Sequence, residues 1–205
     1  MLGEFHAAVD DPTLLAFWPG DFCLRVEYRV NAGVLDGTYH IVNPGSEPLP
    51  YGFGTHPYFR VPLGGEDAAD CVVGLPVHEE WELNNLLPTG IRFPLRDYTM
   101  FHQGLQFGSM QFDSVFSGLT FDEDGLCRTW VYDPDSGRRV VQSFDKHFTC
   151  CVVYTPDHRE AVCIEPYTCV PNAMRLHAAG IPSGLKILEP GASVTLRVSI
   201  GVQES

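Results

Sequence analysis

Hydrophobic and polar residues alternate one by one over several stretches of this chain, which is the pattern of a strand with one buried face. The clearest stretch runs from Phe22 to Val30, where every second side chain is apolar. The same alternation returns near the end of the chain, from Val194 to Val202. Both stretches therefore predict half-buried strands.

Further strands are predicted from shorter apolar stretches that end at glycine, proline or other turn residues. These stretches are residues 14–18, 38–43, 51–59, 112–116, 126–132, 138–144, 148–154 and 161–165. The stretch 38–43 follows Phe22–Val30 across a glycine-containing turn, so we expect the two to form an antiparallel pair. Residues 70–110 contain apolar pieces broken by prolines, which predicts short strands joined by long loops.

Helical patterns are scarce along the chain. Only Asn172–Ala179 is expected to form a helix, because it follows Pro171 and ends at Gly180. Residues 1–12 show little periodicity and predict an irregular lead-in. Because 20 glycines and 16 prolines separate many short strands, the chain predicts one all-β domain over residues 1–205, a large sandwich or barrel.

Charge and hydropathy narrow the functional classes. The formal net charge is −13 and the pI is near 4.8, so the surface repels phosphate backbones and nucleic acid is not an expected partner. No apolar run is long enough to cross a bilayer, and the first residues lack the basic and apolar regions of a secretion signal. We therefore expect a cytoplasmic protein without a membrane partner.

The seven cysteines follow no recognisable pairing pattern. Their number is odd, Cys150 and Cys151 are adjacent, and no two have the spacing Cys-x-x-Cys. This argues against a disulfide framework and against a structural zinc site, and it predicts free thiols in a reducing compartment. A metal ion is therefore not expected from the sequence.

His56 is the first candidate for chemistry. It lies in the stretch Tyr51–Phe59, where two glycines would weaken an ordinary strand and therefore suggest close approach by another backbone or by a ligand. A histidine here can donate a proton, and the adjacent Tyr58 and Phe59 can stack on a ring-shaped ligand. The alternative role is a structural histidine that is hydrogen-bonded to a backbone carbonyl.

Glu165 is the matching candidate for a proton acceptor. It ends the otherwise apolar run Ala161–Ile164 and is followed by Pro166. A carboxylate among such neighbours is costly to bury without a partner, and this is an environment in which glutamates act as general bases. The alternative is a glutamate at a sheet edge that points to water. Since His56 is more than a hundred residues away, the two form one site only if the fold brings them together.

Asp113 is a third candidate, in the predicted strand segment Gln111–Phe116. A carboxylate at this place can accept hydrogen bonds from sugar hydroxyls, whereas the alternative is a capping or turn aspartate. The residues alone do not separate these two roles.

Three blocks of this sequence resemble the aldose 1-epimerase (galactose mutarotase) family. The first, residues 50–59, is similar to the family's block that holds the catalytic acid histidine, and residues 111–116 are similar to the block that holds a sugar-binding aspartate. The third comprises residues 154–156, 162–168 and 171–173 and is similar to the block with the catalytic base. The order and spacing of the blocks also match.

The resemblance implies a large β-sandwich, the galactose mutarotase-like supersandwich, and a reaction without a cofactor. Glu165 would take the proton of the anomeric hydroxyl of a hexose, and His56 would protonate the ring oxygen. Asp113 would bind the sugar, with Tyr58 and Phe59 beside its ring. The chain is thus expected to be an isomerase that interconverts α and β anomers, and whether the hexose is free or phosphorylated is left open.

The resemblance also implies a further N-terminal portion, with several strands, an arginine and a second histidine that contact the sugar, and this chain is expected to lack it. A sheet edge or part of the core would then be exposed. A second copy of the chain could cover that edge in a homodimer. The alternatives are a fragment, or a carbohydrate-binding module of the same fold without catalysis.

Overall fold

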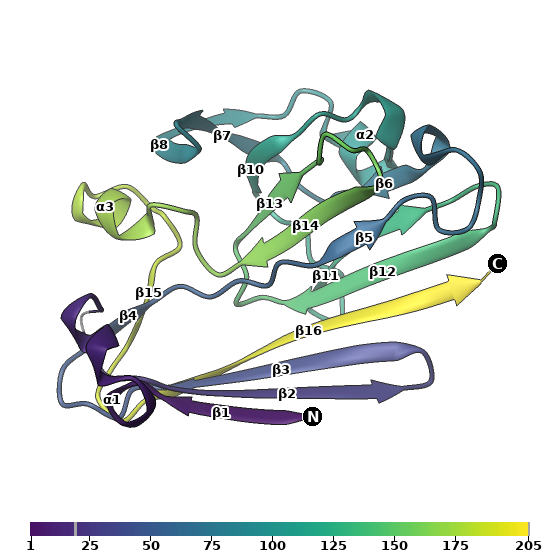
Figure 1. Cartoon of the computed structure of the whole chain (residues 1–205). Coiled ribbons are helices and arrows are strands. Elements are labelled where there is room, and N and C mark those ends of the chain that lie inside the picture. Colours follow the sequence, from purple (N-terminus) through teal and green to yellow (C-terminus); the bar gives the residue numbers. More distant parts are fainter. Residues whose placement is uncertain (19, 205) are drawn as a thin grey trace.

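The computed structural model describes residues 1–18 and 20–204, and most of these residues lie in strands (Figure 1). The strands are β1 (Leu2–His6), β2 (Cys23–Asn31), β3 (Val34–Val42), β4 (Leu49–Tyr51), β5 (Tyr58–Arg60), β6 (Val72–Gly74), β7 (Glu79–Asn84), β8 (Leu87–Pro94), β9 (Leu105–Gln106), β10 (Asp113–Ser117), β11 (Leu126–Tyr132), β12 (Arg138–Asp145), β13 (Cys150–Tyr154), β14 (Ala161–Tyr167), β15 (Lys186–Leu188) and β16 (Ser193–Glu204). The short α-helices are α1 (Ala7–Asp10), α2 (Tyr98–Gln103) and α3 (Ala173–Ala178), and the 3-10 helices are η1 (Pro12–Ala16), η2 (Ala68–Asp70) and η3 (Phe107–Ser109).

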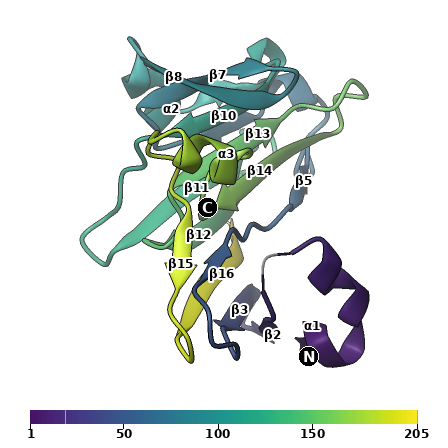
Figure 2. The same cartoon turned by 90° about the vertical axis from the view of Figure 1, so that its left-hand side faces the viewer.

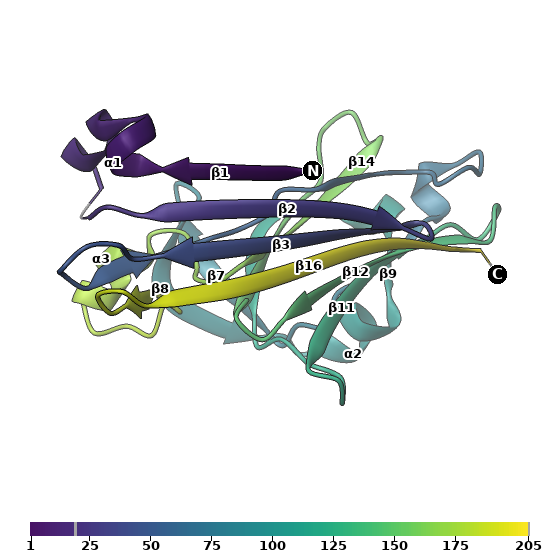
Figure 3. The same cartoon turned by 90° about the horizontal axis from the view of Figure 1, so that it is seen from below.

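The strands form two main antiparallel sheets that face each other, which confirms the predicted all-β sandwich (Figures 1 and 3). Within the described residues, the larger sheet has eight strands in the order β1-β2-β3-β16-β12-β11-β6-β9. The smaller sheet has six, in the order β5-β14-β13-β10-β7-β8. A separate pair, β15 and β4, lies beside them.

The hydrophobic core lies between these two sheets. Phe144 of β12 and Leu196 of β16 come from the larger sheet, and Phe116 of β10 and Ile164 of β14 come from the smaller one. All four side chains are fully buried in one cluster. Burying a side chain of this size contributes about 1.5–3 kcal/mol relative to leaving it exposed, so the alternating faces of the strands determine how the sheets pack.

The strand pattern predicted from the alternation is confirmed over most of the chain. Residues 126–132 form β11, and the predicted antiparallel pair of the first half is β2 with β3, in the register Cys23↔Val42 to Asn31↔Val34. The strand β2 is nevertheless only partly covered, because Val30 at its far end is 76% exposed. The end of the larger sheet near β1 thus presents apolar side chains to solvent.

Three expectations about local structure were wrong. Residues 1–12 are not an irregular lead-in, because β1 pairs with β2 along its whole length and α1 follows. Residues 14–18 do not form a strand: the Asp11 carboxylate accepts a hydrogen bond from the Thr13 backbone, and η1 begins at Pro12. The segment 172–179 contains α3 but is not the only helix, since α1 and α2 are also present.

The described helices are all short. The longest α-helices have six residues, and none in residues 1–18 and 20–204 has the length and apolar character needed to cross a membrane. Through Leu176, α3 packs on the outer face of the smaller sheet, in a cluster with Val115 and Cys150 (Figure 2). That end of the outer face is therefore covered by α3.

The two glycines of the stretch 51–59 lie where another part of the chain comes very close, as predicted. Gly54 forms an isolated bridge with Tyr167, and a β-carbon at Gly54 would lie 2.2 Å from Cδ1 of that ring. At Gly52 a β-carbon would lie 2.6 Å from Sγ of Cys169. Any larger residue at Gly54 would push the loop away from β14.

We predict that Gly54→Ala lowers the free energy of unfolding by about 1–3 kcal/mol, because the added methyl group overlaps the Tyr167 ring. Urea unfolding measures this difference. Gly3→Ala is the control, since a β-carbon there meets no atom within 4 Å. Equal stability of the two variants would contradict the close approach described above.

Candidate functional site

The strand β14 supplies the centre of the site. Its side chains alternate, so Val162 and Ile164 enter the core, whereas Cys163, Glu165 and Tyr167 lie on the outer face of the smaller sheet. All three lie next to the loop between β4 and β5. Glu165 does not lie at an open sheet edge, because it pairs with Val152 of β13 on one side and the loop that carries His56 lies along the other.

The loop that carries His56 is fastened to the end of β14 by its backbone. Phe53 donates its N–H to the Thr168 hydroxyl at 2.9 Å and accepts the Thr168 N–H at 2.9 Å, and Thr55 donates to the Pro166 carbonyl at 3.3 Å. Together with the Gly54 bridge, these bonds hold residues 53–55 beside β14. His56 follows directly and therefore faces Glu165.

His56 and Glu165 are in direct contact, with Nε2 of the imidazole 3.2 Å from Oε1 of the carboxylate. The second carboxylate oxygen, Oε2, accepts a hydrogen bond from the Tyr167 hydroxyl at 2.6 Å. The Glu165 side chain is 4% exposed and that of His56 is 56% exposed. The pair thus joins a buried carboxylate to an imidazole that is open to solvent, which is the arrangement expected of an acid and a base at the floor of a ligand site.

Cys163 contacts the other nitrogen of the same imidazole. Its Sγ lies 3.2 Å from His56 Nδ1 and 3.1 Å from the Pro57 carbonyl oxygen, to which the thiol donates. Burial, and then the negative charge of Glu165, raises the pKa of the Cys163 thiol. Both nitrogens of His56 therefore have a protein partner.

A metal ion has one set of possible ligands at this site. One nitrogen of His56, Sγ of Cys163 and a carboxylate oxygen of Glu165 lie within 4.8 Å of one another, and this donor set suits zinc. The two ring nitrogens, however, face different partners, so a metal ion would have to displace one of the two contacts.

Tyr58 lies beside the pair and is half exposed, and its ring centroid is 5.3 Å from that of His56. Desolvation and the charges of Cys163, Glu165 and Tyr154 raise the pKa of the Tyr58 hydroxyl. Phe59, the next residue, points to the opposite face of β5 and is buried in the core. The expectation that both rings contact a ligand is therefore wrong for Phe59, because neighbouring residues of a strand face opposite sides.

Asp113 lies on the same outer face, at the first position of β10. The register places it opposite Tyr154, Tyr154 opposite Cys163, and Cys163 opposite Tyr58, so these four residues form one row across the sheet. Three strand spacings make this row about 14 Å long. Asp113 is exposed and is about 10 Å from Cys163, so it does not contact the His56–Glu165 pair but borders the same surface.

Sequence reasoning missed three residues of this surface, which are Tyr154, Cys163 and Tyr167. Cys163 and Tyr167 carry a signal that was available, because they are two positions before and after Glu165 in a predicted strand and so share its face. Tyr154 lies on this surface because β13 pairs with β14. The alternation of residues within one strand does not predict which strands pair.

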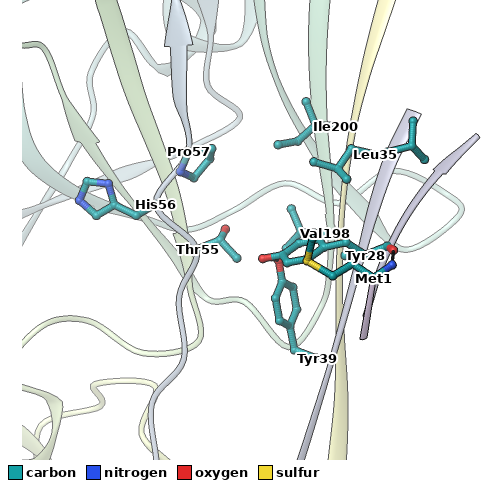
Figure 4. A pocket seen from close by; sticks show the side chains of 11 residues that line it. Met1, Tyr28, Leu35, Tyr39, Thr55, His56, Pro57, Val198 and Ile200 are labelled. Carbon is teal, nitrogen blue, oxygen red and sulfur yellow. Dashed lines mark hydrogen bonds between the residues drawn. The ribbon is translucent and has the colours of Figure 1, made fainter. Parts of the chain in front are cut away.

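A cavity of about 620 Å³ lies on the other side of the His56 loop (Figure 4). It is bordered by residues 55–57, His56 included, on one side and by β2, β3 and β16 on the other, with Tyr39 and Val198 among its mainly apolar residues. The imidazole of His56 points away from this space. The charged and hydrogen-bonded groups converge instead on the outer face of the smaller sheet.

Solved structures of other proteins share this fold. A galactose mutarotase-like protein from Clostridium acetobutylicum aligns with a TM-score of 0.85 at 23% identity, over 100% of this chain and 62% of its own length. The Slr1438 protein from Synechocystis aligns with a TM-score of 0.74 at 23% identity, over 100% of this chain and 61% of its own length. The GalM/aldose epimerase homologue from C. elegans aligns with a TM-score of 0.75 at 17% identity, over 99% of this chain and 64% of its own length. This chain spans less than two thirds of the length of each.

These likenesses confirm the galactose mutarotase-like sandwich predicted from the sequence. A scan against family models gives the relationship at the level of sequence, since the model described as aldose 1-epimerase matches residues 4–201. That match covers almost every described residue, including all three blocks on which the resemblance was based. The chain therefore belongs to the aldose 1-epimerase family.

Proposed function

We propose that this chain interconverts the α and β anomers of a free hexose by acid–base catalysis at His56 and Glu165. The observation that supports this most strongly is the 3.2 Å contact between His56 Nε2 and Glu165 Oε1. Opening a hexose ring requires proton removal from the anomeric hydroxyl and proton delivery to the ring oxygen. Both oxygens are bonded to the same carbon, so the base and the acid must be neighbours, as these two groups are.

The proposed reaction conserves its protons. Glu165 removes the proton from the C1 hydroxyl, the bond from C1 to the ring oxygen breaks as the aldehyde forms, and His56 protonates the released oxygen. After the aldehyde group rotates, the hydroxyl returns its proton to His56 and attacks the opposite face of C1. Glu165 then returns its proton to the former aldehyde oxygen, which becomes the new anomeric hydroxyl. Each group is expected to contribute about 10²–10⁴-fold to the rate.

We predict that the protein accelerates the change in optical rotation of freshly dissolved α-D-glucose or α-D-galactose, and that Glu165→Gln abolishes this acceleration while sugar binding persists. The amide keeps the size and the hydrogen bond from Tyr167 but cannot accept the proton. Glu123→Gln, at an exposed position, is the control. Turnover retained in Glu165→Gln would exclude Glu165 as the base. Binding without acceleration by the unaltered chain would instead favour a carbohydrate-binding module of the same fold.

Tyr167 should position the base in this mechanism. Its hydroxyl occupies Oε2 of Glu165 at 2.6 Å, which leaves Oε1 to face His56 and the substrate. Removal of a hydrogen bond to a charged group costs about 1.5–3 kcal/mol. In this proposal Oε2 is held by Tyr167, and Oε1 takes part in the reaction beside His56.

We expect Tyr167→Phe to lower kcat about 10-fold or more with little change in KM, because the carboxylate loses the bond that fixes its orientation. Polarimetry at several sugar concentrations measures both constants. Tyr98→Phe is the control, because Tyr98 is an exposed tyrosine of α2 outside this surface. An unchanged kcat in Tyr167→Phe would remove Tyr167 from this role.

Asp113 is proposed to bind sugar hydroxyls at the far end of the row. Asp113→Asn should raise KM about tenfold and leave kcat nearly unchanged, since the loss of one charge-assisted hydrogen bond is worth about 1.5–3 kcal/mol and the residue is remote from the proton transfers. Asp70→Asn, an exposed aspartate of η2, is the matched control. An unchanged KM in Asp113→Asn would remove this residue from the site.

A further inference from the structure

The Cys163 thiol has a single proton, and three groups that can accept it lie around it. Its sulfur is 3.2 Å from Nδ1 of His56 and 3.1 Å from the Pro57 carbonyl oxygen. The side chain of Glu165 is a third hydrogen-bond partner of the same thiol. One proton cannot fully serve three acceptors, so this point of the site is rich in lone pairs of sulfur, nitrogen and oxygen.

The separations of these atoms suit a metal ion. Zinc binds sulfur at about 2.3 Å and nitrogen or oxygen at about 2.0–2.2 Å, so neighbouring ligand atoms of a tetrahedral site lie about 3.3–3.6 Å apart. The contacts of His56 with Cys163 and with Glu165 are both 3.2 Å. One ligand atom from each of the three residues can be chosen so that all of them lie within 4.8 Å of one another.

His56 is the residue that can adjust to the ion. Its two contacts use different ring nitrogens, so the ring must turn until one nitrogen faces both the sulfur and the carboxylate. The His56 side chain is 56% exposed, whereas that of Glu165 is 4% exposed and Cys163 is buried. The exposed side also leaves room for a water molecule as the fourth ligand of a tetrahedral zinc ion.

The charges of the three ligands favour a divalent ion. When zinc binds, the thiol proton is released to solvent, and a thiolate, a carboxylate and a neutral imidazole hold the ion. Two negative charges then balance the two positive charges, and a neutral cluster is less costly to bury than an isolated charge. Thiolate and imidazole ligands select zinc, whereas magnesium and calcium prefer sites made of oxygen atoms.

We propose that Cys163, His56 and Glu165 form a zinc site, and that zinc bound there inhibits the interconversion of anomers. The ion would occupy a ring nitrogen of His56 and a carboxylate oxygen of Glu165, which are the two groups that move protons in the proposed mechanism. The inhibition therefore rests on the proposed function, whereas the binding of zinc does not.

Cobalt(II) is the probe for the site, because a bound thiolate gives a near-ultraviolet charge-transfer band and tetrahedral ligands give intense visible bands. We expect both bands in the unaltered protein, and zinc should abolish them by displacing cobalt. Cys163→Ala should lose the charge-transfer band and weaken zinc binding by more than the about 10–100-fold that loss of a supporting residue costs. No thiolate band in the unaltered protein with excess cobalt would overturn the metal site, and this result needs no variant to fold.

Cys23→Ala is the matched control. Cys23 is a second thiol close to a histidine and a carboxylate, because it lies opposite His6 in the pairing of β1 with β2 and His6 contacts Asp21 at 2.7 Å. Both cobalt bands should persist in this variant. A charge-transfer band that disappears in Cys23→Ala and persists in Cys163→Ala would place the ion elsewhere and overturn the proposal.

Polarimetry tests the inhibition. Zinc should stop the acceleration of optical-rotation change over the same concentration range in which it binds, EDTA should restore the rate, and magnesium at equal concentration should have no effect. A protein that keeps its full rate when saturated with zinc would overturn the inhibitory role. A protein that shows the thiolate band but no turnover, even after treatment with EDTA, would uphold the metal site and reject the proposed function.

Discussion

The close approach of the His56 loop to β14 is the constraint on which the site depends. Residues 53–55 pair with the end of β14 through backbone hydrogen bonds, and the lack of a side chain at Gly54 makes room for the Tyr167 ring. Without this contact His56 would belong to a connecting loop and Glu165 to a buried strand, with nothing to join them. The fold thus brings two residues 109 positions apart to 3.2 Å.

The cost of burying Glu165 explains why so many groups surround it. An isolated buried carboxylate is strongly disfavoured, so each of its oxygens needs a partner. Tyr167 supplies one and His56 the other, and the cysteine beside them is buried and neutral. The same partners that make burial tolerable also orient the groups for proton transfer. Stability and chemistry therefore depend on the same few contacts.

The sequence predicted the sandwich and the two main site residues for different physical reasons. Alternation with a period of two appears directly in strands such as β11 and β16, so their existence and faces could be predicted. His56 and Glu165 were identified by unusual neighbours and by resemblance to a family. Their contact could not be predicted from either stretch alone, because it depends on the pairing of the loop with β14.

The predictions that were wrong, and the site residue that was not predicted, have equally specific physical causes. The Leu14–Trp18 stretch looked like a strand, but it finds no partner strand and its start is capped by Asp11 instead. Phe59 was expected beside the ligand with Tyr58, although neighbouring strand residues cannot share a face, and it lies in the core. Tyr154 enters the site only through the register of β13 on β14. Local patterns therefore predict elements well and predict surfaces shared by several strands poorly.

The most direct test of this account is a crystal structure of the Glu165→Gln variant with a bound hexose. The account predicts the sugar on the outer face of the smaller sheet, with its anomeric hydroxyl at residue 165 and its ring oxygen within hydrogen-bond distance of His56 Nε2. Asp113 and Tyr58 should border it. A hexose bound instead in the cavity between the His56 loop and strands β2, β3 and β16 would contradict the account.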